Sequence, residues 1–177
     1  RPYKDDEYSY QSIYVFLIEL KKDDSITALS NLIHSAFPEP TILIYQRMNT
    51  NTISLAEKRI NKVEKDKTVV EEVVLSKILD NVTDNQISLK SISGKDLKEY
   101  YSNLVTWLYK LKVLSITNIY PEKDIDFKPL LNQYERLTTE IKKLKEEYKK
   151  ASMISEKMRI DDELYDKEVD LKHLKED

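Results

Sequence analysis

Two charged side chains, Glu19 and Lys21, stand at the end of an apolar segment that runs from Ser12 to Leu20. Successive side chains of a β-strand point to opposite faces, so residues two positions apart share a face. A carboxylate and an ammonium on one face, together with an upstream carboxylate, can hold a divalent metal ion and activate a water molecule. The spacing of Glu19 and Lys21 is therefore the strongest candidate for a catalytic site in the chain.

The Glu-x-Lys arrangement is typical of the PD-(D/E)xK nucleases, and Asp5 or Asp6 is the available upstream carboxylate. In that fold the aspartate usually begins a strand of its own, which a turn pairs to the Glu-x-Lys strand. Here a short segment without a turn signal separates Asp6 from the apolar run. A Mg²⁺-dependent nuclease using Glu19 and Lys21 is therefore an alternative, and a strand whose end charges face solvent is the simpler interpretation.

Composition excludes several other kinds of site. The 177 residues include one glycine, two histidines and no cysteine. Nucleotide-binding loops and nucleophile elbows need two or more glycines at fixed spacing, and disulfides and thiolate metal sites need cysteine. We therefore expect no cofactor, with Mg²⁺ required only by a nuclease. His34 is expected near the end of a helix, where it can interact with the last carbonyl groups or with solvent.

The densest basic stretch is a candidate nucleic-acid contact, because phosphate binding needs little beyond positive charge. It consists of Lys58, Arg59, Lys62, Lys65 and Lys67. Glu57, Glu64 and Asp66 dilute its field, and the formal net charge of −3 gives no overall attraction to nucleic acid. A nucleic-acid-binding accessory domain is thus a second alternative, beside a plain solvated loop.

The residues before 130 predict an α+β or α/β body with a small mixed sheet. Strands are expected over 12–20, 41–47, 52–59 and 68–75, and the first reads as a strand covered on both faces. A helix begins after Asp23-Asp24-Ser25 and ends before Pro38 and Pro40. Turns are expected at 49–51 and 80–85. A second helix over 95–114 begins at the capping box of Asp96 and Glu99, just after Gly94.

Half of the residues from 130 to 177 are charged, and this part contains neither glycine nor proline. Its apolar residues recur every three or four positions, which predicts either an antiparallel helical hairpin that bends near Ala151 or one long coiled-coil helix. Such a charged helix needs a packing partner. The candidate interaction residues are Tyr134, Leu137, Ile141, Leu144, Tyr148, Ile160, Leu164, Leu171 and Leu174. We expect a globular body over 1–129 and a helical appendage over 130–177.

Three blocks of the chain resemble the family called domain of unknown function 4391. They are Ile18-Glu19-Leu20-Lys21, the Pro-x-Pro block from Leu32 to Leu43, and the helix over 95–114 with its tryptophan and the charged tail behind it. Members of that family look like bacterial and archaeal proteins often encoded beside SNF2-type helicases and restriction-type DNA methyltransferases. The resemblance implies a part in a DNA restriction or antiphage system, and it implies no catalytic residues.

The main hypothesis is a non-catalytic accessory subunit whose tail binds a second copy of the chain or a helicase or methyltransferase partner. The longest apolar run, Ile13 to Ile18, is too short to span a membrane, and no signal-peptide pattern precedes it. We therefore expect a cytoplasmic protein without membrane contact. Because the chain begins with Arg1, we also expect its natural N-terminus to be missing.

Overall fold

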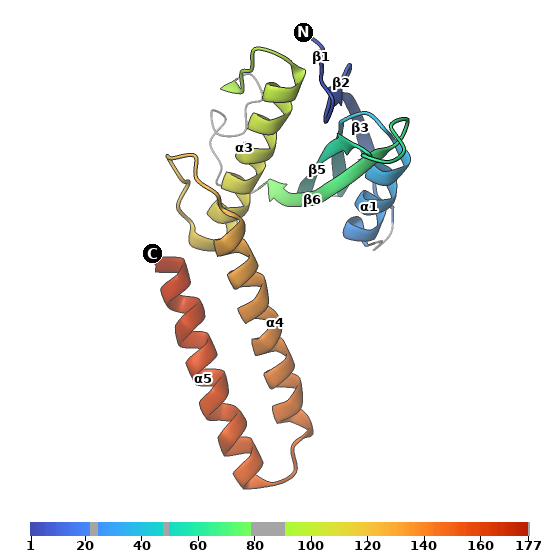
Figure 1. The fold of residues 1–177 in the computed structure, drawn as a ribbon. Coiled ribbons are helices and arrows are strands. Elements are labelled where there is room, and N and C mark those ends of the chain that lie inside the picture. Colours follow the sequence, from blue (N-terminus) through green and yellow to red (C-terminus); the bar gives the residue numbers. More distant parts are fainter. Residues whose placement is uncertain (22–24, 48–49, 79–90, 177) are drawn as a thin grey trace. The chain divides into compact units, whose positions relative to one another are not determined.

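The computed structural model describes residues 1–21, 25–47, 50–78 and 91–176. They form an α+β fold, as predicted, in two compact units over 1–115 and 116–177 (Figure 1). The second unit begins before the predicted boundary at residue 129, because it includes the segment that leads into the tail. The first unit holds β1 (Tyr3–Lys4), β2 (Ser9–Tyr10), β3 (Tyr14–Glu19), α1 (Ile26–Ala36), β4 (Thr41–Arg47), β5 (Thr50–Ile60), β6 (Thr68–Ile78) and most of α3 (Leu97–Thr117).

The main sheet has the strand order β3-β4-β5-β6. β3 pairs parallel to β4, and the other two pairings are antiparallel. Parallel neighbours need a crossover connection, and α1 provides it, beginning after the N-cap residue Ser25. The predicted β-α-β-β order and the fourth strand are confirmed. The predicted turn at 49–51 is wrong for Thr50 and Asn51, which belong to β5; Asn49 and the expected turn at 80–85 lie outside the described residues.

The first strand differs from expectation in its position. β3 is an edge strand, and Tyr14, Val15 and Leu17 on it are exposed. The prediction that it is covered on both faces was therefore wrong. A continuous apolar sequence is typical of a central strand, but strand order depends on contacts between distant segments that the sequence of β3 does not contain.

The start of α3 explains the single glycine. The Asp96 carboxylate accepts a hydrogen bond of 2.9 Å from the backbone N–H of Glu99, which confirms half of the predicted capping box. The Glu99 carboxylate in turn accepts from the N–H of Lys95 at 3.3 Å. A Cβ on Gly94 would collide with the backbone N of Tyr100 and lie 2.7 Å from its Cα. Gly94 is therefore required for close approach to the first turn of α3.

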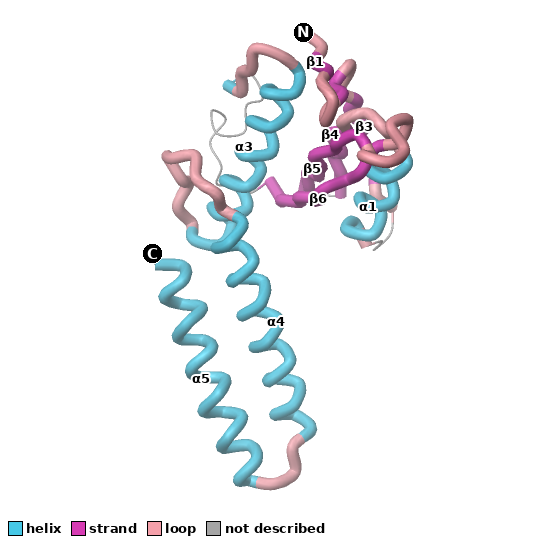
Figure 2. Tube along the Cα trace, in the orientation of Figure 1, coloured by secondary structure: helices cyan, strands magenta, loops and turns pink. Residues whose placement is uncertain are grey.

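The second unit contains a helical hairpin (Figure 2). Its helices are α4 (Lys128–Lys150) and α5 (Ile154–Glu176), and the break at 151–153 matches the predicted bend. Pro129 lies in the first turn of α4, where its missing N–H costs nothing. Interhelical ion pairs join Lys167 to Glu140 at 2.8 Å and Lys145 to Glu168 at 2.7 Å. These pairs and the apolar seam fix how the two helices align.

Replacement of Gly94 by alanine should destabilise the first unit by about 1–3 kcal/mol, because the new Cβ meets backbone atoms that cannot rotate away. Urea unfolding followed through the fluorescence of Trp107, the only tryptophan, measures the change. Ser93→Ala is the matched control, because Ser93 is exposed and should shift stability by less than about 0.5 kcal/mol. Equal stabilities of the two variants would contradict this account.

Candidate functional site

Lys58 is the most unusual charged residue of the first unit. It lies on β5 at a β-bulge, and it is only 2% exposed. Its ammonium donates hydrogen bonds to the carbonyl oxygens of Phe37 at 2.5 Å and Glu39 at 2.7 Å, with a longer contact of 3.4 Å to the Thr41 hydroxyl. Phe37 and Glu39 belong to the connection between α1 and β4, and Thr41 is the first residue of β4.

That connection contains Pro38 and Pro40, which have no backbone N–H to donate. Its partly buried carbonyl groups still need hydrogen-bond donors. The ammonium of Lys58 donates to two of them, and the Thr41 hydroxyl also donates to the Glu39 carbonyl at 2.8 Å. Burial lowers the pKa of Lys58 to about 8, and the nearby Glu39 carboxylate acts in the opposite direction. Lys58 is therefore mainly protonated at neutral pH, and its hydrogen bonds are committed to the Pro-x-Pro connection.

A second set of buried polar groups joins α1 to the sheet. His34 Nε2 lies 3.0 Å from Ser54 Oγ on β5, and the hydroxyl of Ser30 donates to the hydroxyl of Tyr45 on β4 at 2.9 Å. Burial, and to a smaller extent the charge of Lys58, lowers the pKa of His34 to about 4. The predicted role of His34 at the helix end or in solvent was therefore wrong. The spacing of Ser30 and His34, four residues apart on one helix face, was the available signal.

Tyr101 connects α3 to the same part of the sheet. Its hydroxyl accepts a hydrogen bond from the N–H of Ala56 at 3.1 Å and donates one to the carbonyl of Thr41 at 2.8 Å. Ser54 and His34 have no exposed surface, so a substrate cannot reach this serine–histidine pair. The geometry of the buried polar cluster, which consists of Ser30, His34, Tyr45, Ser54, Lys58 and Tyr101, supports a structural role.

The structure does not bring together the carboxylates that the nuclease alternative requires. Glu19 is exposed at the end of β3. It is level with Gln46 of β4, which is in turn level with Asn51 near the start of β5. The Asp5 carboxylate accepts from the N–H groups of Glu7 and Tyr8, and the Glu7 carbonyl accepts from the N–H of Ile60 at the other end of β5. Asn51 and Ile60 are nine positions apart along β5, which corresponds to roughly 30 Å.

The remaining nuclease candidates are also dispersed. Lys21 and Asp6 are exposed. Across the described ranges, no group of three histidine or carboxylate side chains is arranged to hold a metal ion.

The five residues of the predicted nucleic-acid surface have different environments. Lys58 is buried, Arg59 pairs with Glu71 at 3.4 Å, and Lys67 pairs with Glu64 at 2.8 Å. Lys62 and Lys65 are exposed in the connection between β5 and β6. The number of positive charges in this stretch could not reveal that Lys58 points into the protein.

Most of the predicted interaction residues line the hairpin's own interior. Leu137, Ile141, Leu144 and Ile160 are buried, and Tyr148 is exposed. The half-buried members are Tyr134, Leu164, Leu171 and Leu174. The buried members of the heptad pattern therefore pack α4 against α5.

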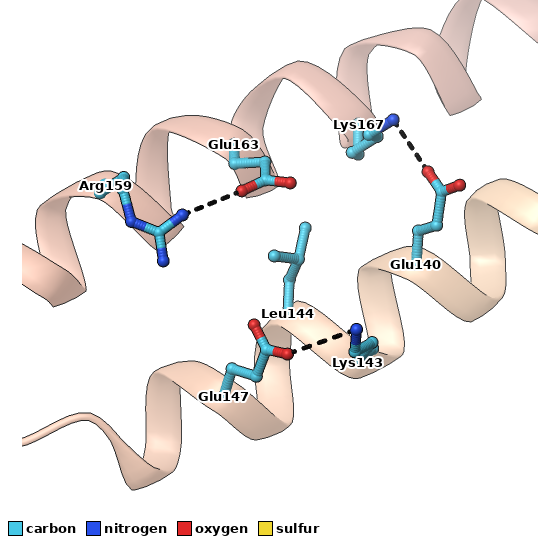
Figure 3. A pocket seen from close by; sticks show the side chains of 7 residues that line it. All are labelled: Glu140, Lys143, Leu144, Glu147, Arg159, Glu163 and Lys167. Carbon is cyan, nitrogen blue, oxygen red and sulfur yellow. Dashed lines mark hydrogen bonds and ion pairs between the residues drawn. The ribbon is translucent and has the colours of Figure 1, made fainter.

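A groove of about 410 Å³ lies along the hairpin, and charged side chains line most of it (Figure 3). Lys143 pairs with Glu147 and Arg159 with Glu163 along their own helices, and Lys167 pairs with Glu140 between the helices. Leu144 is its one apolar lining residue. Because each lining charge has a partner of opposite sign, the groove offers no net charge to a ligand.

An exposed apolar surface follows the outer side of α5. Ile154 is 79% exposed, Met158 is 65% exposed and Tyr165 is 69% exposed. Residues four and seven apart return to within about 40° on an α-helix, so these three side chains share one face, which we call the α5 stripe. Sequence reasoning missed the α5 stripe because it followed only the heptad track, although the spacing of these residues was visible.

The fold is thus an α+β body, which contains a buried polar cluster, together with a charged helical hairpin. Residues 1–171 match the family described as a domain of unknown function (DUF4391), and the chain belongs to this family. No curated protein and no solved structure matched the chain. No described helix is long and apolar enough to cross a membrane.

Replacement of Lys58 by methionine should destabilise the protein, because the Phe37 carbonyl loses its donor and the Glu39 carbonyl keeps only the Thr41 hydroxyl. An unsatisfied carbonyl costs about 1–3 kcal/mol, and the second lost hydrogen bond adds to this while removal of a buried charge offsets part, so a net loss of about 1–3 kcal/mol is expected. Lys62→Met removes an exposed lysine close by and is the control. Chemical unfolding measures both, and similar stabilities would contradict the assigned role of Lys58.

His34 should make folding stability depend on pH between about 4 and 6.5. In this window its pKa, lowered to about 4 in the folded state, leaves the folded protein with fewer bound protons than the unfolded chain. Stability due to His34 is therefore complete above pH 6.5 and falls on acidification, by at most about 1.4 kcal/mol per pH unit.

The His34→Gln variant can retain a hydrogen bond to Ser54 without titrating, so it is the matched comparison. Unfolding free energies of wild type and variant should converge as the pH falls from 7 to 4.5. A difference that stays constant over this range would show that His34 does not titrate as described.

Proposed function

We propose that this chain is a non-catalytic accessory subunit that binds another protein through the α5 stripe. Following the family resemblance, its partner is a helicase or methyltransferase of a bacterial DNA restriction or antiphage system. The observation that carries the proposal is the exposure of Ile154, Met158 and Tyr165 on one helix face. Amphipathic helices commonly recognise partners through apolar residues at such spacings.

Exposure of the α5 stripe to water costs free energy. Burial of each such side chain is worth about 1.5–3 kcal/mol relative to exposure. The hairpin already has a separate interior face on α5, where Ile160 is buried. The α5 stripe therefore lies outside the interior of the hairpin, and contact with a partner would bury its side chains. Methionine and tyrosine suit such a surface, since methionine adapts its shape and tyrosine can keep its hydroxyl in water.

The charges around the α5 stripe favour a basic partner. Asp161 lies on the same face between Met158 and Tyr165, and Asp162 and Asp166 follow nearby on the helix. The basic neighbours of Met158 have other contacts: Arg159 pairs with Glu163, and Lys157 lies over the Tyr148 ring. Complementary charge fixes the orientation and increases the association rate more than it increases affinity. We therefore propose a partner helix with an apolar ridge flanked by lysine or arginine.

The state of the other candidate residues supports a binding role over catalysis. Lys58 is committed to backbone carbonyls, and Asp5 caps a turn far from Glu19 along the sheet. The groove of the hairpin is lined by paired charges. These residues are occupied by structural contacts, whereas the side chains of the α5 stripe remain available.

Co-purification with a co-expressed candidate helicase or methyltransferase tests the proposal. The double variant Met158→Glu/Tyr165→Glu should lose co-elution, because two buried carboxylates at the interface would have to be desolvated. Both positions are exposed, so the fold itself should be unaffected. Lys142→Glu adds a carboxylate at an exposed site on the other helix and should leave co-elution intact. Retained binding by the double variant would exclude the α5 stripe as the interface.

A further inference from the structure

The open edge of β3 presents both unpaired backbone groups and exposed apolar side chains. In the described part of the sheet, β4 is the only neighbour of β3. The N–H of Tyr14 donates to the carbonyl of Pro40 at 2.9 Å, and the N–H of Leu20 donates to the carbonyl of Gln46 at 3.0 Å. In a parallel pair alternate residues bond to the same neighbour. The even-numbered residues of β3 therefore face β4.

The backbone groups of Val15, Leu17 and Glu19 consequently point to the open edge. Phe16 is level with Leu43, which is level with Ser54, and Ser54 contacts His34 of α1. The Phe16 side chain therefore lies on the α1 side, where its ring centroid is 4.9 Å from that of Phe37. The side chains of the odd-numbered residues lie on the opposite face of the sheet. Val15 is 59% exposed and Leu17 is 65% exposed. One set of residues thus offers hydrogen-bonding groups and apolar surface together.

The two edges of the sheet are protected to different degrees. Proteins usually guard an edge strand with charged residues, proline or a bulge, because an unguarded edge is a template for another strand. β6, the other edge, carries Glu71, Glu72 and Lys77, and a bulge distorts its pairing with β5. β3 reads Tyr-Val-Phe-Leu-Ile before its first charge at Glu19. The β3 edge is therefore the one suited to strand pairing.

We infer that β3 pairs with β3 of a second copy of this chain, in antiparallel orientation and centred on Leu17. The outward-facing residues of β3 are odd-numbered, so the pairing must set odd-numbered residues of the two copies opposite each other. A register centred on Leu17 does so along the whole strand. It sets Leu17 opposite Leu17 of the partner and Val15 opposite Glu19. The four valine and leucine side chains then form one apolar cluster across the symmetry axis.

Charge supports the antiparallel orientation. With Leu17 at the centre, the two Glu19 carboxylates lie at opposite ends of the paired segment, whereas parallel pairing in register would set them side by side. Like charges directly opposite one another destabilise a sheet. The interface is small, since β3 has six residues, and small interfaces are typical of weak association. A dimer that forms at high protein concentration and dissociates on dilution is expected.

Cysteine cross-linking of the full chain tests both the pairing and its register, because the chain has no cysteine of its own. Opposed residues in an antiparallel pair have Cα atoms about 5.5 Å apart, which allows a disulfide. Leu17→Cys should therefore give a disulfide-linked dimer under mild oxidation. Val15→Cys is similarly exposed, but its own counterpart lies about four strand residues away, so it should cross-link many-fold less.

Two further variants identify the cause of any cross-link. Val15→Pro in the Leu17→Cys background removes an outward N–H without removing a bond to β4, and it should reduce the cross-linked fraction several-fold. Met158→Glu changes only the α5 stripe and should leave it unchanged. Loss of the cross-link in the Met158 variant would assign self-association to the hairpin instead and overturn the inference.

Sedimentation of the unmodified chain over a wide concentration range supplies an independent measure. A mass that rises with concentration in wild type but not in Val15→Pro supports β3 pairing, provided that circular dichroism shows both to be folded. Equal cross-linking through Cys at 15 and 17 would indicate random collision and overturn the proposed register. A monomer at every concentration would overturn pairing with a second copy and leave the edge to an extended segment of another protein.

Discussion

The hydrogen bonds from Lys58 to the carbonyl groups of Phe37 and Glu39 hold the first unit in its arrangement. Two prolines deprive this connection of backbone donors, and the connection sets where β4 begins beside β3. A buried ammonium carries a desolvation cost, which is visible in the lowered pKa of Lys58. The hydrogen bonds to the Phe37 and Glu39 carbonyl groups offset this cost, because without Lys58 the Phe37 carbonyl would lack a donor. The buried lysine therefore stabilises the Pro-x-Pro connection.

This arrangement explains why the polar residues of the body do not form an open site. His34, Ser30 and Tyr101 attach α1 and α3 to the sheet around the same connection. Each is buried and hydrogen-bonds a strand of the sheet, His34 through its Nε2 atom. Their chemistry supplies specificity of packing, because a helix placed differently would leave them unpaired. This cluster therefore offers no surface to another molecule.

Local chemistry allowed several elements to be predicted from sequence. The bounds of β4, the N-cap at Ser25 and the cap at Asp96 follow from residues close together in the chain. The edge position of β3 and the burial of Lys58 depend on segments distant in sequence, so no local pattern could reveal them. The heptad track predicted the helical hairpin correctly. It could not say whether the apolar seam met its own chain or a partner, because both arrangements need the same spacing.

The two exposed apolar surfaces differ in the kind of partner that each can accept. The backbone of α5 is satisfied within the helix, so the α5 stripe offers side chains alone and suits another helix. β3 offers unpaired backbone groups as well, and only an extended strand can satisfy those. The surfaces therefore do not compete for one partner. If both proposals hold, a dimer formed through β3 carries two α5 stripes. A partner with two matching sites would then bind with higher apparent affinity than either stripe provides alone, wherever the geometry allows both to engage.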